Sequence, residues 1–118
     1  MKRYFVVFLF VYVASLTAAV AKELTALDFY RFCQEPSTAA PSTGCMAYIR
    51  GLLDGMTMGN HLQKWPLTYC LLEQGVPADQ GKLIIEKYFR DHPSELQGSV
   101  GPMAILAIAQ AFPCRPPN

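Results

Sequence analysis

The clearest pattern in the chain is an apolar stripe of helical period over residues 45–59, which read CMAYIRGLLDGMTMG. This stripe recurs at spacings of three, four and one, as expected for one face of an α-helix, and consists of Met46, Ile49, Leu52, Leu53 and Met56. Glycines also recur in this segment, at a spacing of four residues. A glycine inside a helix costs about 1 kcal/mol relative to alanine, so their repetition indicates that another helix approaches closely.

Gly51 and Gly55 are the glycines at the centre of this predicted helix. They would either make room for a neighbouring helix of the same chain or form the seam of a homodimer. The charged Arg50 and Asp54 lie among them and argue against a helix that spans a membrane. We therefore expect Gly51 and Gly55 to be packing residues of the scaffold or of a dimer.

A shorter helix is predicted before this one, from Thr25 to about Gln34. The Thr25 side chain can cap the N-terminus of this helix. The inward-facing residues of the helix would be Leu27, Tyr30 and Cys33. The next segment, Glu35–Gly44, holds two prolines and small polar residues without periodicity. We expect it to be a linker that ends where the second helix opens at Cys45.

Two further helices are predicted in the second half of the chain. The third spans residues 78–91, between Pro77 and the His92-Pro93 pair that would end it. Its solvent-exposed residues would be Lys82, Glu86, Lys87 and Arg90. The fourth runs from Pro93 to about Phe112, with a kink or break at Pro102. Its core face would comprise Leu96, Val100, Met103, Ala104, Ala107 and Ala111. A short connection makes these two helices roughly antiparallel.

The first 21 residues have the features of a secretory signal peptide. Lys2 and Arg3 precede an apolar run, and an A-x-A sequence predicts cleavage after Ala21. The remaining 97 residues, 22–118, suffice for one domain. Without the leader, eight basic residues face nine acidic ones and no basic cluster exists. Nucleic acid and membranes are therefore not expected as partners of the mature chain.

Four cysteines lie in the exported part: Cys33, Cys45, Cys70 and Cys114. An even number in a small secreted chain predicts two disulfides, and three pairings are conceivable. We favour Cys33 with Cys45, because these residues close the first helix and open the second. Cys70 would pair with Cys114, because antiparallel third and fourth helices bring these positions together. The fold class predicted is thus all-α, a four-helix domain stapled by two disulfides.

Catalytic and metal-binding patterns are weak in this chain. His61 and His92 are isolated, and no C-x-x-C pair occurs, so no metal site and no cofactor are expected. A cysteine nucleophile activated by a histidine would need a free thiol, and the disulfides use all four. Asp79 and Glu86 are too loosely spaced to support acid-base hydrolysis. We therefore predict that the protein is not an enzyme and has no catalytic residue.

Binding to another protein is the function that remains. Aromatic and basic side chains that serve as binding anchors gather in the segment after the second helix. These partner-binding candidates are His61, Gln63, Lys64, Trp65 and Tyr69. Trp65, the single tryptophan, would either anchor a partner or pack down over the helices as a lid. The turn segment Glu73–Asp79 is the second candidate.

The order of these elements resembles the Rap/Tai immunity proteins of type VI secretion. The resemblance rests on Cys33, on the C-x-x-Y-I-x-G opening at Cys45, on Tyr69-Cys70 before Val76-Pro77, on His92-Pro93, and on the closing Phe112-Pro113-Cys114. It covers nearly all of residues 22–118 and departs from the family at Gly101-Pro102, where small helix-forming residues are usual.

The resemblance implies a periplasmic, helical and often homodimeric protein. Its partner would be a cognate cell-wall amidase effector, which it would block by occluding the active-site cleft. Two other functions are compatible with a small helical periplasmic domain. One is an acid-stress chaperone, and the other is a carrier of a lipid or small ligand, which would require an interior cavity.

Overall fold

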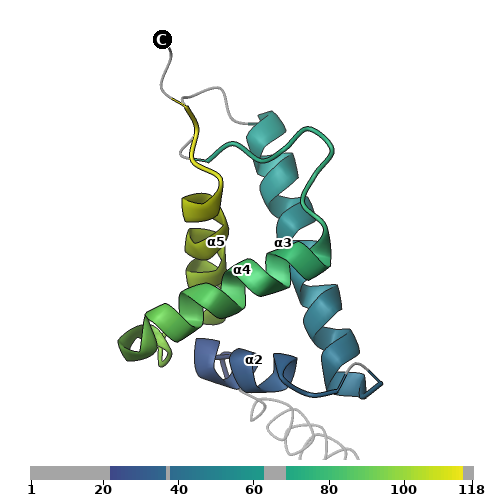
Figure 1. Cartoon of the computed structure of the whole chain (residues 1–118), viewed down its shortest axis with the longest axis vertical. Coiled ribbons are helices and arrows are strands. Elements are labelled where there is room, and N and C mark those ends of the chain that lie inside the picture. Colours follow the sequence, from purple (N-terminus) through teal and green to yellow (C-terminus); the bar gives the residue numbers. More distant parts are fainter. Residues whose placement is uncertain (1–21, 37, 63–68, 116–118) are drawn as a thin grey trace, which may run out of the picture.

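The computed structural model describes residues 22–36, 38–62 and 69–115 of the chain, and the fold in this part is all-α, as predicted. Four α-helices follow one another in these residues, with a short 3-10 helix before the last. They are α2 (Ala26–Cys33), α3 (Ala40–Leu62), α4 (Ala78–Asp91), η1 (Pro93–Glu95) and α5 (Val100–Ala111). Figure 1 shows α4 crossing in front of α3 and α5, while α2 lies beneath this crossing. None of the described helices is both long and apolar enough to span a bilayer.

Helix α2 begins as the sequence predicts. The backbone N–H of Asp28 donates to the Thr25 hydroxyl oxygen over 3.1 Å, which satisfies one of the free donors of the first turn. Its inward face was predicted incorrectly in part. The buried residues are Ala26, Phe29 and Cys33, whereas Leu27 and Tyr30 are only half-buried. Ala26 and Phe29 lie one position before the predicted Leu27 and Tyr30, whereas Cys33 is buried as predicted.

Helix α3 is longer at both ends than the sequence indicates. It begins at Ala40 and not at Cys45, so half of the predicted linker is helical. Pro41 lies in the first turn, where a helix residue needs no hydrogen-bonded N–H, and therefore does not prevent the earlier start. At the other end α3 continues past Gly59 to Leu62. The buried face of α3 consists of Cys45, Ile49, Leu53 and Met56.

Helix α4 packs across α3 at Gly81, a glycine outside the repeated spacing of α3. A Cβ atom added to Gly81 would lie 2.9 Å from Leu53 Cδ1 and 3.1 Å from Ile49 Cγ2. The absence of a side chain at Gly81 therefore permits the close approach of α3 and α4. The helix ends before His92, as predicted, and the backbone N–H of His92 donates to the Tyr88 carbonyl.

The fourth predicted helix is divided. Residues 93–95 form a separate 3-10 turn, and α5 starts only at Val100. Pro102 consequently lies in the first turn of α5 and does not kink it, because its missing N–H would have no partner there. The buried residues of α5 are Val100, Ala104, Ala107 and Ile108; Ala111, predicted to be in the core, is exposed.

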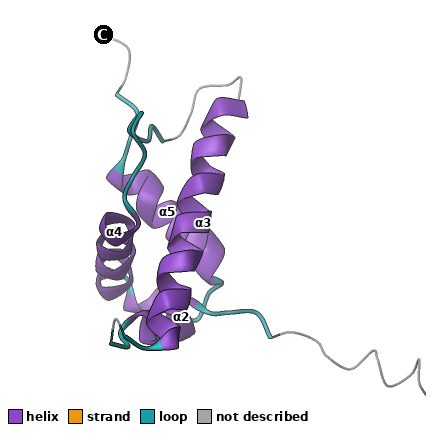
Figure 2. Cartoon of the chain, turned by 90° about the vertical axis from the view of Figure 1, so that its right-hand side faces the viewer, coloured by secondary structure: helices purple, strands orange, loops and turns teal. Residues whose placement is uncertain are grey.

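Both predicted disulfides are present: Cys33–Cys45 and Cys70–Cys114. The reason given for the second pairing was wrong, because α4 runs obliquely across α5 instead of alongside it (Figure 1). Residues 69–72 run beside the end of α5 instead, and the N–H of Cys70 donates to the Phe112 carbonyl over 2.8 Å. Figure 2, turned by 90°, shows α3 nearest the viewer, with α4 to its left and α5 behind it.

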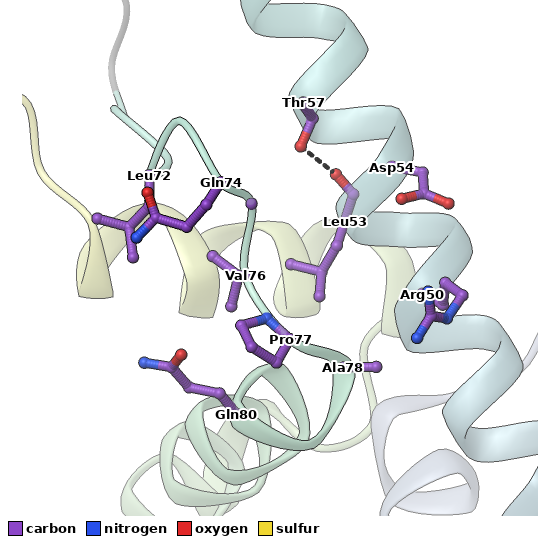
Figure 3. Close-up of a pocket in the computed structure, with 11 residues that line it drawn as sticks. Arg50, Leu53, Asp54, Thr57, Leu72, Gln74, Val76, Pro77, Ala78 and Gln80 are labelled. Atoms are coloured by element: carbon purple, nitrogen blue, oxygen red, sulfur yellow. Dashed lines mark hydrogen bonds between the residues drawn. The ribbon is translucent and has the colours of Figure 1, made fainter.

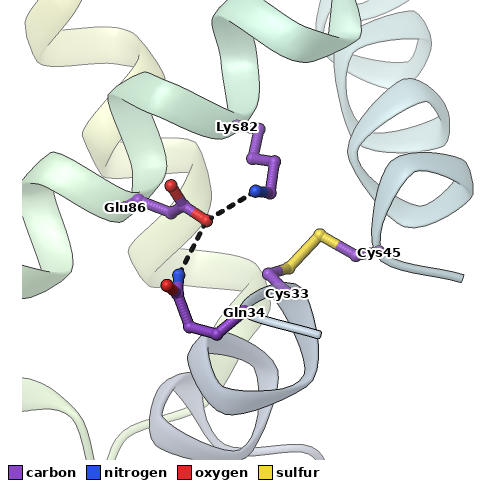
Figure 4. Close-up of a disulfide and its surroundings, with 5 residues drawn as sticks. All are labelled: Cys33, Gln34, Cys45, Lys82 and Glu86. Atoms are coloured by element: carbon purple, nitrogen blue, oxygen red, sulfur yellow. Dashed lines mark hydrogen bonds and ion pairs between the residues drawn. A yellow bond between two sulfur atoms is a disulfide. The ribbon is translucent and has the colours of Figure 1, made fainter. Parts of the chain in front are cut away.

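Glu86 is buried, with 8% of its surface exposed, although the sequence pattern places it in solvent. Its carboxylate pairs with the Lys82 ammonium at 3.0 Å and accepts a hydrogen bond from the Gln34 amide at 2.9 Å. Figure 4 shows this group beside the Cys33–Cys45 disulfide. Because Gln34 caps the C-terminal end of α2, the buried carboxylate joins α4 to α2. The predicted exposure was wrong because α2 covers this face of α4.

Candidate partner-binding surface

The predicted binding residues do not all lie on one loop. His61 is exposed in the last turn of α3, and Leu62 next to it has 72% of its surface exposed. Gln63, Lys64 and Trp65 lie outside the described residues. Tyr69 is half-buried, and its hydroxyl donates to the Met56 carbonyl over 3.3 Å. Tyr69 therefore packs onto α3, which gives it a structural contact of its own.

Gly51 and Gly55 are exposed on α3. A Cβ atom added to either would meet no atom of the described chain within 4 Å. Packing against a neighbouring helix of the same chain, one of the two explanations for these glycines, is therefore not observed. Close helix contacts in the described chain occur at other glycines, namely Gly81, where α4 meets α3, and Gly44, where α3 meets Phe32 of α2.

The two glycines border a shallow apolar hollow between α3 and α5. Its volume is about 330 Å³, and its other lining residues are Leu52, Met56, Tyr69 and Ile105. Ile105 remains 41% exposed, so the hollow is an apolar surface open to solvent. No charged side chain is among its lining residues in the described chain.

A larger cleft lies on another side of α3, between this helix and the segment that leads into α4 (Figure 3). Its volume is about 440 Å³. Leu53 extends from α3 toward Val76 and Ala78 and forms an apolar wall with them. Polar side chains complete the lining: Arg50, Asp54, Thr57, Gln74 and Gln80.

Residues 72–78, which form the wall of the cleft opposite α3, make a hydrogen-bonded turn. Gly75 has a φ angle of 79°, a conformation that strongly favours glycine, and its N–H donates to the Leu72 carbonyl over 2.8 Å. Pro77 then fixes the entry into α4, as predicted. This segment overlaps Glu73–Asp79, the second predicted binding candidate. Arg50 lines the cleft together with this segment, and no sequence pattern indicates this because the contact between α3 and the turn is tertiary.

The charges at the cleft are unpaired within the described part of the chain. In the described part of the chain, the ion pairs are Lys82–Glu86 and Lys87–Asp91, both on α4. Neither Arg50 nor Asp54 therefore has an ion-pair partner among the described residues. The Thr57 hydroxyl donates back to the Leu53 carbonyl over 2.9 Å, which leaves its oxygen able to accept a further bond.

His92 has a structural position at the end of α4. Its ring stacks on Tyr88 with the centroids 4.0 Å apart, and its Nδ1 lies 2.8 Å from the Tyr88 carbonyl oxygen. The Tyr88 hydroxyl donates to a Glu95 carboxylate oxygen over 3.1 Å. Burial and this neighbouring carboxylate raise the pKa of Tyr88. Tyr88, His92 and Glu95 therefore hold the turn after α4 against the end of that helix.

No thiol is available for nucleophilic chemistry in the described residues, because all four cysteines are in disulfides. The same residues contain no group of three side chains suited to hold a metal ion. The described helices carry several surface concavities, among them the polar cleft and the apolar hollow. The described residues thus form a small helical domain held together by two disulfides.

The comparisons with known proteins identify the family. Residues 25–114 match the family model of the Rap1a immunity proteins. The matched region begins at the Thr25 cap, ends at Cys114, and includes all four described α-helices and both disulfides. The chain belongs to this family of immunity proteins, which are non-enzymatic inhibitors of a cognate toxin effector. A search of the curated proteins found no match.

Proposed function

We propose that this protein is a periplasmic immunity protein that binds and inhibits a peptidoglycan-cleaving amidase delivered by type VI secretion. The observation that carries the proposal is the family match over residues 25–114, which implies a cognate toxin effector. The two disulfides support an oxidising compartment such as the periplasm. An amidase that attacks the cell wall would act in that compartment.

Export would depend on the first 21 residues as a signal peptide cleaved after Ala21. The basic start, the apolar run and the A-x-A sequence support this. The intact mass of the protein purified from the periplasm tests it directly. A chain that begins at Lys22 is expected, and a periplasmic protein that still carries Met1–Ala21 would contradict cleavage.

Inhibition would be stoichiometric, with the protein covering the entrance to the amidase active site. The segment after α3 is the proposed contact because it carries Gln63, Lys64 and Trp65 and because its flanking residues, His61 and Leu62, are exposed. Tryptophan is enriched among residues that dominate binding energy at interfaces. Trp65 is therefore the proposed anchor of this contact.

The test is a titration of the amidase effector encoded beside the immunity gene, with peptidoglycan hydrolysis as the readout. Hydrolysis should stop at one equivalent of immunity protein. Trp65→Ala should weaken binding at least tenfold. The control is Phe32→Ala, which removes an exposed aromatic side chain on α2 and should leave binding unchanged. A wild-type protein that neither binds nor inhibits this amidase would refute the proposal.

The proposed homodimer would use the apolar hollow at Gly51 and Gly55. Two exposed glycines without a neighbour in the described chain would let a second helix lie close to the α3 backbone. Light scattering with size-exclusion chromatography measures the mass in solution. Gly55→Leu should convert a dimer to a monomer, while Gln97→Leu on an exposed turn should not. A wild-type monomer at micromolar concentration would contradict this use of the hollow.

A further inference from the structure

The polar cleft between α3 and residues 72–78 is a preformed concavity. One wall is α3, whose Ile49 and Leu53 are buried in the core. The other wall follows the Cys70–Cys114 disulfide, turns at Gly75 and continues into α4. Both walls are therefore held by the fold, so a ligand would not have to order them on binding. The volume of the cleft, about 440 Å³, is enough for a few side chains of a partner.

The two charges at this cleft differ from the equally spaced charges of α4. Arg50 and Asp54 lie four residues apart on α3, a spacing at which opposite charges on a helix are neighbours. Lys82–Glu86 and Lys87–Asp91 have the same spacing and the same order, and both pairs form ion pairs. Within the described residues, Arg50 and Asp54 form none, although both line the cleft. Both charges are thus available to a binding partner.

The lining selects the chemistry of that partner. A guanidinium group such as that of Arg50 binds a carboxylate through two parallel hydrogen bonds. Asp54 accepts from an N–H or O–H group, and Leu53, Val76 and Ala78 contact an apolar side chain. One positive and one negative charge give the cleft no net field, so a pattern of groups is recognised instead of a highly charged surface. A protein loop that presents an acidic and an apolar side chain together fits this lining.

We infer that this cleft receives an acidic loop of the cognate effector, with Arg50 as the residue that pairs with its carboxylate. The inference rests on the proposed function and adds a second contact to it, on the side of α3 away from the apolar hollow. Arg50 would then contribute to the choice of effector, because an effector without the acidic residue would leave the guanidinium unpaired in the interface.

The experiment compares Arg50→Ala and Asp54→Asn with Arg90→Ala, an exposed arginine on α4 that lines none of the hollows described above. The probe is the purified amidase effector encoded beside the immunity gene. Arg50→Ala should raise the Kd at least tenfold, and Arg90→Ala should change it less than twofold. The urea midpoints of all three variants should match that of the wild type, because these side chains are exposed. Added NaCl should weaken the wild-type complex more than the Arg50→Ala complex.

Hydrogen exchange in the complex provides a second readout. Residues 50–57 and 72–80 should gain protection when the effector binds. A charge exchange completes the test, since Arg50→Glu should lose binding and a lysine in place of the effector's acidic residue should restore it.

Three results would overturn the inference. The first is inhibition by Arg50→Ala at wild-type affinity, which would leave the proposed function intact. The second is protection of the cleft by self-association without effector, which would assign it to a second copy of the chain. The third is a wild-type protein that does not bind the effector, which would refute the proposed function together with the inference.

Discussion

Alanine in place of Gly81 tests how α3 and α4 pack. The added Cβ would lie 2.9 Å from Leu53 Cδ1 and 3.1 Å from Ile49 Cγ2, whereas carbon atoms in contact prefer about 3.5–4.0 Å. Ile49 is β-branched and fully buried, so it cannot move away easily. Overpacking of this kind costs about 1–3 kcal/mol, and the better helix propensity of alanine returns about 1 kcal/mol. We expect Gly81→Ala to lower the free energy of unfolding by about 1 kcal/mol.

Gly55→Ala is the matched control, because it makes the same chemical change on an exposed face of α3. Its new methyl group would meet nothing in the described chain within 4 Å, so only the propensity gain remains. The free energy of unfolding should rise by about 1 kcal/mol, which separates the two variants by about 2 kcal/mol. Measurements at low protein concentration keep self-association out of the comparison.

Urea unfolding followed by circular dichroism, with the disulfides intact, measures both variants in the same units. Equal stability of Gly81→Ala and Gly55→Ala would refute the assignment of Gly81 as the point of close approach. A crystal structure of Gly81→Ala should show α4 displaced from α3 or Leu53 rotated into the cleft.

The remaining predictions concern the buried carboxylate, the disulfides and acid stability. Glu86→Ala should lower the free energy of unfolding by about 2 kcal/mol, because it removes the ion pair with Lys82 and the hydrogen bond from Gln34 that the buried carboxylate makes. An unchanged urea midpoint would contradict this. Cys70→Ser should lower the free energy of unfolding by about 4 kcal/mol and Cys33→Ser by about 3 kcal/mol, because the two disulfides close loops of 44 and 12 residues. Thermal denaturation ranks the two variants, and the reverse order would contradict this entropic explanation. The hydrogen bond from Lys87 lowers the pKa of Asp91. The stabilisation by Asp91 is therefore complete above about pH 4 and is lost as the pH falls through its lowered pKa. Acid titration of stability should show a smaller fall in Asp91→Asn than in the wild type, and identical titrations would contradict this.

The glycines show where sequence reasoning reaches its limit. The repeated spacing of Gly51 and Gly55 predicts close helix packing, yet both residues are exposed to solvent. Gly81 stands alone in its helix, and its packing role depends on where α4 crosses α3. A crossing point is set by the packing of two surfaces, and no local pattern in either helix encodes it.

Glu86 and Arg50 illustrate the same limit for charged residues. The helical pattern puts both on the polar side of their helices. Tertiary structure then covers Glu86 with α2 and places Arg50 beside the turn at Gly75. Hydrophobic periodicity reports how apolar a face is, and it does not report which neighbour covers the edge of that face.

The sequence by itself determined what local chemistry controls. Periodicity, the Thr25 cap and the His92-Pro93 junction predicted the all-α class and most helix ends, and the even number of cysteines predicted two disulfides. The Cys70–Cys114 pair was predicted from an antiparallel helix arrangement that the structure does not have, so its true cause is tertiary. Tertiary structure alone decided the oblique crossing of α4, the division before Val100 and the cleft next to Arg50. Each of these depends on contacts between residues distant in the chain, whose energies no single segment carries.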